Sequence, residues 1–137
     1  MLYKYYISEL NYHLYKIIYI NLWKNHGGVS MERENVRVIL WGVGAMGRGI
    51  AETLLKKKGV EIVGAIDIEE KFGKSLYDYL DVERGNREDI TIGSHEDIVK
   101  ENGADIAIIA TDSFVKDNFG KIKYCLERKI NVISTAE

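Results

Sequence analysis

Three glycines and one aspartate are the residues in this chain whose type and spacing first suggest chemistry. Gly42, Gly44 and Gly47 form a GxGxxG pattern directly after the apolar run VRVILW, and a helical pattern follows them. In such a turn the first glycine permits a sharp bend, the second lets a pyrophosphate approach the backbone, and the third brings helix and strand together. Asp67 stands 20 residues beyond Gly47, at the end of the next apolar run, where a carboxylate can bind ribose hydroxyls. The spacing predicts a dinucleotide site.

The helix after the glycine turn is expected to complete the pyrophosphate site. Its first amides have no partner within the helix, and the positive end of its dipole favours an anion. Arg48, within the first helical turn, could either contact a phosphate or remain solvated. The residues predicted to surround the pyrophosphate are Gly42, Val43, Gly44, Ala45, Met46 and Gly47.

Short apolar runs alternate with helical patterns along the chain, and this alternation predicts the fold. Strands are expected at 36–41, 60–66, 90–92, 105–110 and 131–134. Helices are expected at 45–58, around 72–80, from Ser94 to about Gly103, and over 115–126. Strands that alternate with helices require right-handed crossovers. The predicted fold is therefore α/β, a doubly wound parallel sheet of the Rossmann type.

The apolar spacing also predicts which side of each helix faces the sheet. The inward residues expected in the first helix are Ile50, Ala51, Leu54 and Leu55. Those expected in the second are Phe72, Leu76, Tyr79 and Leu80. Those expected in the last are Val115, Phe119, Ile122 and Leu126. Cys125 lies beside that last stripe and is interpreted as a small buried apolar residue rather than a nucleophile.

Composition limits the possible classes of function. The 137 residues have room for one domain, and a net charge of -2 from 19 basic and 21 acidic residues gives no basic surface for nucleic acid. The single cysteine predicts neither a disulfide framework nor a metal cluster and fits a cytoplasmic protein. His13, His26 and His95 lack the spacing of metal ligands, and a catalytic role for any of them is disfavoured.

The first thirty residues differ in composition from the rest, because they hold six of the nine tyrosines. They lack the features of a signal peptide, and their longest charge-free apolar stretch, 17–23, is too short to span a membrane. We expect residues 1–30 to be a translated leader or a loosely attached helix, with Met31 as the true start. Residues 31–137 then form the nucleotide-binding domain.

Four collinear motifs resemble one family. They are WGVGAMGRGIA at 41–51, KKKGVEIVGAID at 56–67, IATDSF at 109–114 and NVISTAE at 131–137. Together they resemble the N-terminal nucleotide domain of the dihydrodipicolinate reductase superfamily. The reductases of lysine biosynthesis typically read GxGGRMG, with an extra residue in the turn. The shorter turn of this chain favours those members of the superfamily that deaminate a diamino acid.

The resemblance implies hydride transfer between a nicotinamide cofactor and a carbon that bears nitrogen. We expect NAD to be preferred, because the Asp67 carboxylate would repel the 2′-phosphate of NADP. NADP stays possible, since Lys71 and Lys74 are near in sequence. By analogy with the family, the residues that border the nicotinamide are Thr111, Asp112, Ser113, Thr135 and Ala136.

The resemblance also implies catalytic groups that lie outside the nucleotide-binding domain. Family members place most catalytic groups in a C-terminal substrate domain, which this sequence lacks, so no catalytic base is assigned beyond the candidates Asp112 and Glu137. The substrate is expected to be a small molecule, and the full-length protein a homo-oligomer. Two alternatives stay open: a lysine-pathway reductase, and a dinucleotide-binding module without catalysis.

Overall fold

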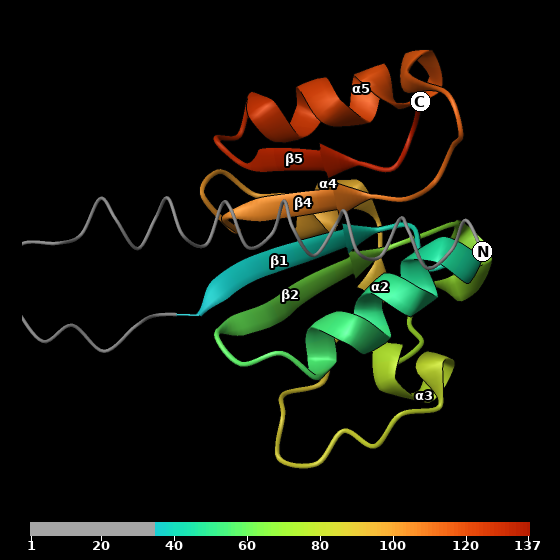
Figure 1. The fold of residues 1–137 in the computed structure, drawn as a ribbon, viewed down its shortest axis with the longest axis vertical. Helices are drawn as coiled ribbons and strands as arrows, with labels where there is room; N and C mark the ends of the chain where they lie inside the picture. Colours follow the sequence, from blue (N-terminus) through green and yellow to red (C-terminus); the bar gives the residue numbers. More distant parts are fainter. Residues whose placement is uncertain (1–34) are drawn as a thin grey trace, which may run out of the picture. The chain divides into compact units, whose positions relative to one another are not determined.

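The computed structural model describes residues 35–137, which form a five-stranded parallel sheet in the order β3-β2-β1-β4-β5 (Figure 1). The strands are β1 (Val36–Trp41), β2 (Val60–Ile66), β3 (Ile92–Gly93), β4 (Ile106–Ile109) and β5 (Asn131–Ser134). The chain runs outward from β1 through β2 to β3 and then crosses to β4 on the other side of β1. This reversal places a topological switch point between β1 and β4. The predictions on residues 1–30 lie outside the described residues.

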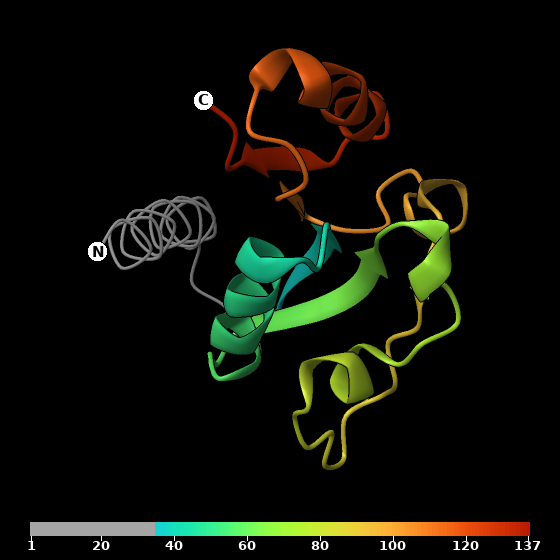
Figure 2. The same ribbon diagram turned by 90° about the vertical axis from the view of Figure 1, so that its right-hand side faces the viewer.

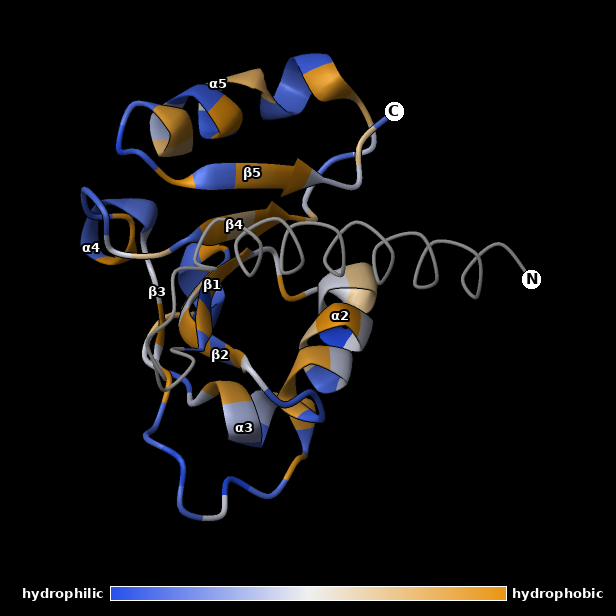
Figure 3. Ribbon diagram, turned by 60° about the vertical axis from the view of Figure 1, so that its left-hand side comes forward, coloured by the Kyte–Doolittle hydropathy of each residue, from blue (hydrophilic) through white to orange (hydrophobic). Residues whose placement is uncertain are grey.

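Helices cover both faces of the sheet, so the predicted doubly wound α/β fold is confirmed (Figure 2). They are α2 (Ala45–Leu55), the 3-10 helix η1 (Glu69–Lys71), α3 (Leu76–Leu80), α4 (His95–Ile98) and α5 (Val115–Leu126). Ile39 and Trp41 of β1 pack in one buried cluster with Cys125 of α5. Val38 and Leu40 alternate with them, so they face the opposite side of the sheet. The strands form the hydrophobic centre, whereas the loop between α3 and β3 is hydrophilic (Figure 3).

The register of the strands brings their carboxyl ends together at one edge. Trp41 at the end of β1 pairs with Ile66 of β2 and with Ile109 of β4. Ile109 in turn pairs with Ser134 of β5. The residues that follow these four positions therefore leave the sheet side by side. They include Gly42, Asp67, Ala110 and Thr135.

Three predicted helices are shorter than expected, and the one expected around 72–80 begins only at Leu76. Helix α2 ends at Leu55 rather than Lys58, because the chain tightens through a Lys57 N–H to Leu54 carbonyl bond of 3.0 Å. Gly59 then turns the chain with a φ of +79°. Helix α4 has a single turn instead of reaching Gly103, since Val99 is extended and its side chain is buried. Its predicted start is confirmed: Ser94 Oγ accepts the Asp97 N–H at 3.2 Å.

The short edge strand β3 begins two residues later than predicted. The Ile90 carbonyl accepts the N–H of Leu76 at 2.7 Å, and the Ile90 N–H donates to the Asp89 carboxylate at 3.0 Å. The backbone of Ile90 is thus occupied by contacts outside the sheet. Pairing with β2 begins only at Ile92, opposite Ala65.

The predicted inward faces of two helices are partly wrong. In α5 the residues Val115, Phe119 and Leu126 are exposed, and Figure 3 shows a hydrophobic stretch at the start of this helix. The buried residues of α5 are Asn118 and Cys125. The helix is rotated by about one residue, because Asn118 hydrogen-bonds the loop beneath it. In the second helix Phe72 and Tyr79 are not buried, and the inward residues are Leu76, Tyr77 and Leu80.

Candidate functional site

The glycine turn between β1 and α2 holds two glycines that the packing of the protein itself requires. Gly42 has a φ of +99°, and a Cβ there would lie 2.6 Å from the Ala110 carbonyl oxygen. A Cβ at Gly47 would lie 1.8 Å from the Gly42 carbonyl oxygen. Both distances are far below a normal contact, so any larger residue would force the helix away from the strands. These are the structural tasks that the sequence pattern assigns to the first and third glycines.

Gly44 differs from the other two glycines. It occupies the N-cap of α2 with no side-chain cap, and a Cβ there would meet no atom within 4 Å. Packing within the described residues therefore does not explain this glycine. The open space lies at the positive end of the α2 dipole, and the first turn of α2 holds no acidic residue. The position therefore suits a negatively charged group such as a pyrophosphate.

Asp67 is anchored beside the glycine turn at the tip of β2. Its Oδ2 accepts the Val43 N–H at 2.6 Å, and its Oδ1 accepts the Ile68 N–H at 2.8 Å. Lys71 Nζ lies 3.0 Å from Oδ1. Burial alone would raise the pKa of Asp67, but these hydrogen bonds and the lysine hold it below its ordinary value. The carboxylate is charged at neutral pH, and the acceptor capacity left on its oxygens suits a hydroxyl donor.

The loop after β4 is held by a network of polar side chains. The Thr111 hydroxyl lies 2.8 Å from Asn118 Oδ1, and Asn118 Nδ2 donates to the Asp112 carbonyl at 3.1 Å. Lys121 Nζ donates to the Thr111 hydroxyl at 2.6 Å and forms an ion pair with the Asp112 carboxylate. Asn118 is fully buried. Asn118 and Lys121 were not predicted as site residues; their polar side chains, three positions apart in an otherwise amphipathic helix, were the available signal in the sequence.

The loops after β4 and β5 are joined through the backbone. The Glu137 N–H donates to the Ser113 carbonyl at 3.0 Å, and the Thr135 N–H donates to the Ile109 carbonyl at 3.1 Å. The Ala136 N–H donates to Ser134 Oγ at 3.2 Å. The residues expected to border a nicotinamide therefore form one continuous margin along the carboxyl ends of β4 and β5, beside the switch point.

The geometry disfavours Asp112 as a catalytic base. The hydrogen bond from Lys121, with a second one from Thr111, lowers the pKa of Asp112 below its ordinary value. A base that works near neutral pH needs a pKa near that pH, so this carboxylate is too weak to accept a proton readily. Its ion pair with Lys121 instead suits a role in holding the loop.

Other candidates from the sequence take structural positions. Arg48 Nη2 donates to the Leu80 carbonyl at 2.7 Å and its Nε to Glu52 at 3.2 Å, so this side chain joins α2 to α3. The His95 ring stacks on Trp41 with centroids 5.3 Å apart. Within residues 35–137, no group of His, Cys, Asp and Glu is arranged to hold a metal, and no helix has the length and apolarity to cross a membrane. Cys125 is buried as predicted, and burial raises the pKa of its thiol to about 11.

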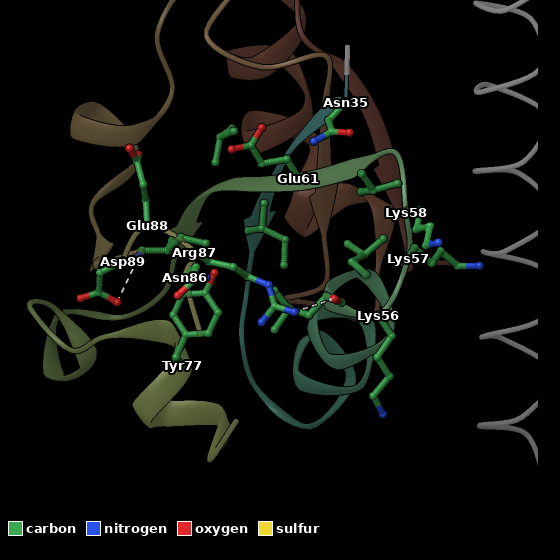
Figure 4. Close-up of a pocket in the computed structure, with 16 residues that line it drawn as sticks. Asn35, Lys56, Lys57, Lys58, Glu61, Tyr77, Asn86, Arg87, Glu88 and Asp89 are labelled. Atoms are coloured by element: carbon green, nitrogen blue, oxygen red, sulfur yellow. Dashed lines mark hydrogen bonds between the residues drawn. The ribbon is translucent and has the colours of Figure 1, made fainter. Parts of the chain in front are cut away.

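A cavity of about 670 Å³ lies at the opposite edge of the sheet, among the end of α2, the start of β2 and residues 86–90 (Figure 4). Arg87 lies there but donates to the Leu55 carbonyl at 3.3 Å and the Glu83 carbonyl at 3.2 Å. Lys56 and Lys57 point away from the cavity. The Arg87 guanidinium is thus occupied by backbone carbonyls, and the cavity is separate from the glycine turn.

The sheet order, the switch point and the glycine turn define a Rossmann-type nucleotide-binding domain. The chain is 51% identical over 104 residues to the 2,4-diaminopentanoate dehydrogenase of Acetoanaerobium sticklandii, an alignment that covers 76% of this chain and 30% of the relative. It also superposes on the amine dehydrogenase of Mycobacterium smegmatis with a TM-score of 0.65 and 32% identity, over 74% of this chain and 30% of the other. No family model matches the sequence.

These two likenesses are to dehydrogenases, and together with the sheet order and the glycine turn they support a nucleotide-binding domain of the dehydrogenase type. Both relatives are dehydrogenases, and dehydrogenases of this kind imply a nicotinamide dinucleotide cofactor. The predicted family resemblance is confirmed at this level. The chain spans about 30% of the length of each relative.

Proposed function

We propose that residues 31–137 bind NAD at the carboxyl edge of the sheet and belong to an amine dehydrogenase that acts on 2,4-diaminopentanoate. The observation that carries the binding site is the contrast among the three glycines. Gly42 and Gly47 are required by the fold, whereas Gly44 faces open space at the start of α2. The substrate is proposed from the 51% identity to the diaminopentanoate enzyme.

In the proposed reaction the C4 amine of the substrate is oxidised. A bound nicotinamide cofactor would supply the acceptor for the hydride that leaves C4, while a proton would leave the nitrogen. Water then adds to the resulting imine and releases ammonia, which gives 2-amino-4-oxopentanoate. Reduction of one NAD balances the two electrons removed from the C–N bond.

Each part of the described site has a proposed task. The backbone from Gly42 to Gly47 holds the pyrophosphate, and Asp67 accepts hydrogen bonds from the adenosine ribose. The loop at 111–113, fixed by Asn118 and Lys121, borders the nicotinamide together with Thr135 and Ala136. This arrangement positions the cofactor, and the groups that act on the substrate amine stay unassigned. A cytoplasmic location and a homo-oligomer of the whole protein stay predictions.

We expect NAD to bind more tightly than NADP, because Asp67 is charged, almost buried and located where we propose that the ribose binds. Titration calorimetry of the 137-residue chain with each cofactor tests the binding. Failure to bind either one would refute the proposed function.

The substrate is tested in the whole-length protein, because the relatives are about three times as long as the aligned segment. Nicotinamide absorbance is followed with 2,4-diaminopentanoate and, separately, with dihydrodipicolinate. We expect oxidation of the former. Turnover of dihydrodipicolinate alone would favour the lysine-pathway alternative, and binding without turnover of either would favour a non-catalytic module.

A further inference from the structure

The ion pair between Asp67 and Lys71 bears on which cofactor the site accepts. The Asp67 side chain is 9% exposed and the Lys71 side chain is 19% exposed, with 3.0 Å between Nζ and Oδ1. Lys71 ends the 3-10 helix η1, one turn beyond the tip of β2. The two opposite charges thus form a partly buried pair at the point where the adenosine ribose is expected.

The surroundings of Lys71 keep it charged and close to the ribose position. Its Nζ lies 5.1 Å from the centroid of the Tyr79 ring, which adds a cation–π contact. Although burial lowers the pKa of Lys71, the contacts with Asp67 and Tyr79 outweigh it, so the net shift is upward. An ammonium group has three donors, and Asp67 and Tyr79 leave capacity for a further acceptor.

This ion pair changes how strongly Asp67 is expected to repel the 2′-phosphate of NADP. A lone carboxylate would strongly repel a 2′-phosphate, which carries about two negative charges. Here the carboxylate has a cation beside it, so the pair has no net charge and part of the repulsion is cancelled. The ammonium is also flexible enough to move from the carboxylate toward a phosphate at the ribose 2′ position.

We propose that Lys71 determines cofactor specificity, because it is poised beside the ribose-binding carboxylate to bind the 2′-phosphate and so admits NADP as well as NAD. This inference rests on the proposed dinucleotide function. It predicts a modest preference for NAD rather than exclusion of NADP. The competing explanation is that Lys71 only stabilises the turn after β2 through its ion pair with Asp67.

The test compares four proteins by titration calorimetry with NAD and with NADP: the unmodified chain, Lys71→Met, Lys71→Arg and Lys74→Met. Lys74, the other lysine near Asp67 in the sequence, is exposed and forms no ion pair with a carboxylate among residues 35–137, so Lys74→Met shows the effect of removing a charge outside the ion pair. Lys71→Met should weaken NADP binding about tenfold more than NAD binding, and Lys74→Met should change both by less than about threefold. Lys71→Arg should retain NADP binding, since arginine also pairs with phosphate.

Several outcomes would overturn the inference. If Lys71→Met weakened the binding of NAD and of NADP equally, the lysine would only support the turn after β2. Equal losses of NADP affinity in Lys71→Met and Lys74→Met would show a general effect of charge. An unmodified chain that binds NAD but not NADP would exclude the proposed role of Lys71 in binding the 2′-phosphate. An unmodified chain that binds neither cofactor would instead refute the proposed function itself.

Discussion

The two halves of the candidate site are built by different means. In the half formed by β1, α2 and β2, the backbone of the glycine turn shapes the site, and the absence of side chains at the glycines is essential. In the half formed by β4, α5 and β5, side chains such as Asn118 and Lys121 hold a loop of ordinary residues. The shape of the first half therefore depends on glycines that lack a Cβ atom, whereas the shape of the second half depends on hydrogen bonds between polar side chains and the loop.

This difference explains why the halves differ in how well a sequence reveals them. Gly47 is required by the carbonyl of Gly42, only five residues away, so the spacing of the turn is visible in the sequence even though Gly42 itself packs against the distant Ala110. A buried amide that bonds a loop six or seven residues earlier depends on how the helix is rotated in the fold. Local spacing does not encode that rotation.

The largest expected effect comes from the third glycine. Gly47→Ala places a Cβ 1.8 Å from the Gly42 carbonyl oxygen and should cost at least about 3 kcal/mol of the free energy of unfolding. The matched control is Gly120→Ala in α5, where a Cβ would meet nothing within 4 Å. It should stabilise the helix by about 0.5–1 kcal/mol. Urea unfolding measures both, and a similar result for the two variants would contradict the packing argument.

Gly44→Val should separate binding from stability. The new side chain would fill the space proposed for the pyrophosphate and should weaken NAD binding at least about 100-fold, which is roughly 2.7 kcal/mol. The midpoint of unfolding should hardly change, because a Cβ at this position meets no atom within 4 Å. Calorimetry and urea unfolding give the two quantities. Unchanged NAD affinity in a folded Gly44→Val protein would remove the pyrophosphate from this turn.

The sequence predicted the fold class and the glycine turn because their signals are short-range. It placed β1, β2 and β5 at their observed bounds, since each is a distinct apolar run. The sequence did not reveal the inward face of α5, because Val115 and Phe119 are apolar yet exposed while the polar Asn118 is buried. Hydrophobic spacing assumes that burial follows polarity, and a buried hydrogen-bond network breaks that assumption.

The ends of β3 and α4 were missed for a related reason. Ile90 has the residue type of a strand, but its backbone is bonded to Leu76 and Asp89. Val99 continues the apolar pattern after α4, but it leaves the helix to enter the core. In both cases a tertiary contact decides the boundary over local preference.

Asn118→Leu tests the half of the site that depends on side chains. The substitution leaves the Thr111 hydroxyl and the Asp112 carbonyl without their buried partner and should cost about 1–3 kcal/mol of stability. Asn131→Leu is the control, because Asn131 is exposed and its Nδ2 donates to the Asp105 carbonyl at 2.9 Å. Its expected cost is below about 1 kcal/mol. Equal costs in urea unfolding would show that the network adds nothing beyond an ordinary surface bond.

The carboxylate of Asp67 predicts a pH dependence in the other half. Its pKa is lower in the folded protein than in the unfolded chain, so the stability that it contributes is present above the unfolded value of about 4. That contribution is lost as the pH falls below about 4 and through the lowered folded pKa. Asp67→Asn should therefore flatten this acid limb of the unfolding midpoint. A limb of unchanged steepness in the variant would assign the acid sensitivity to other carboxylates.

The smallest expected effect comes from the residue whose burial the sequence predicted wrongly. Phe119 is 64% exposed on α5, so Phe119→Ser should change the free energy of unfolding by no more than about 0.5 kcal/mol. Cys125 lies on the same helix but is fully buried in the cluster that joins α5 to the sheet. Cys125→Ser buries a hydroxyl there and should cost about 1–3 kcal/mol. If Phe119→Ser proved the more damaging of the two, α5 would present its aromatic face to the sheet, and the Asn118 network could not form as described.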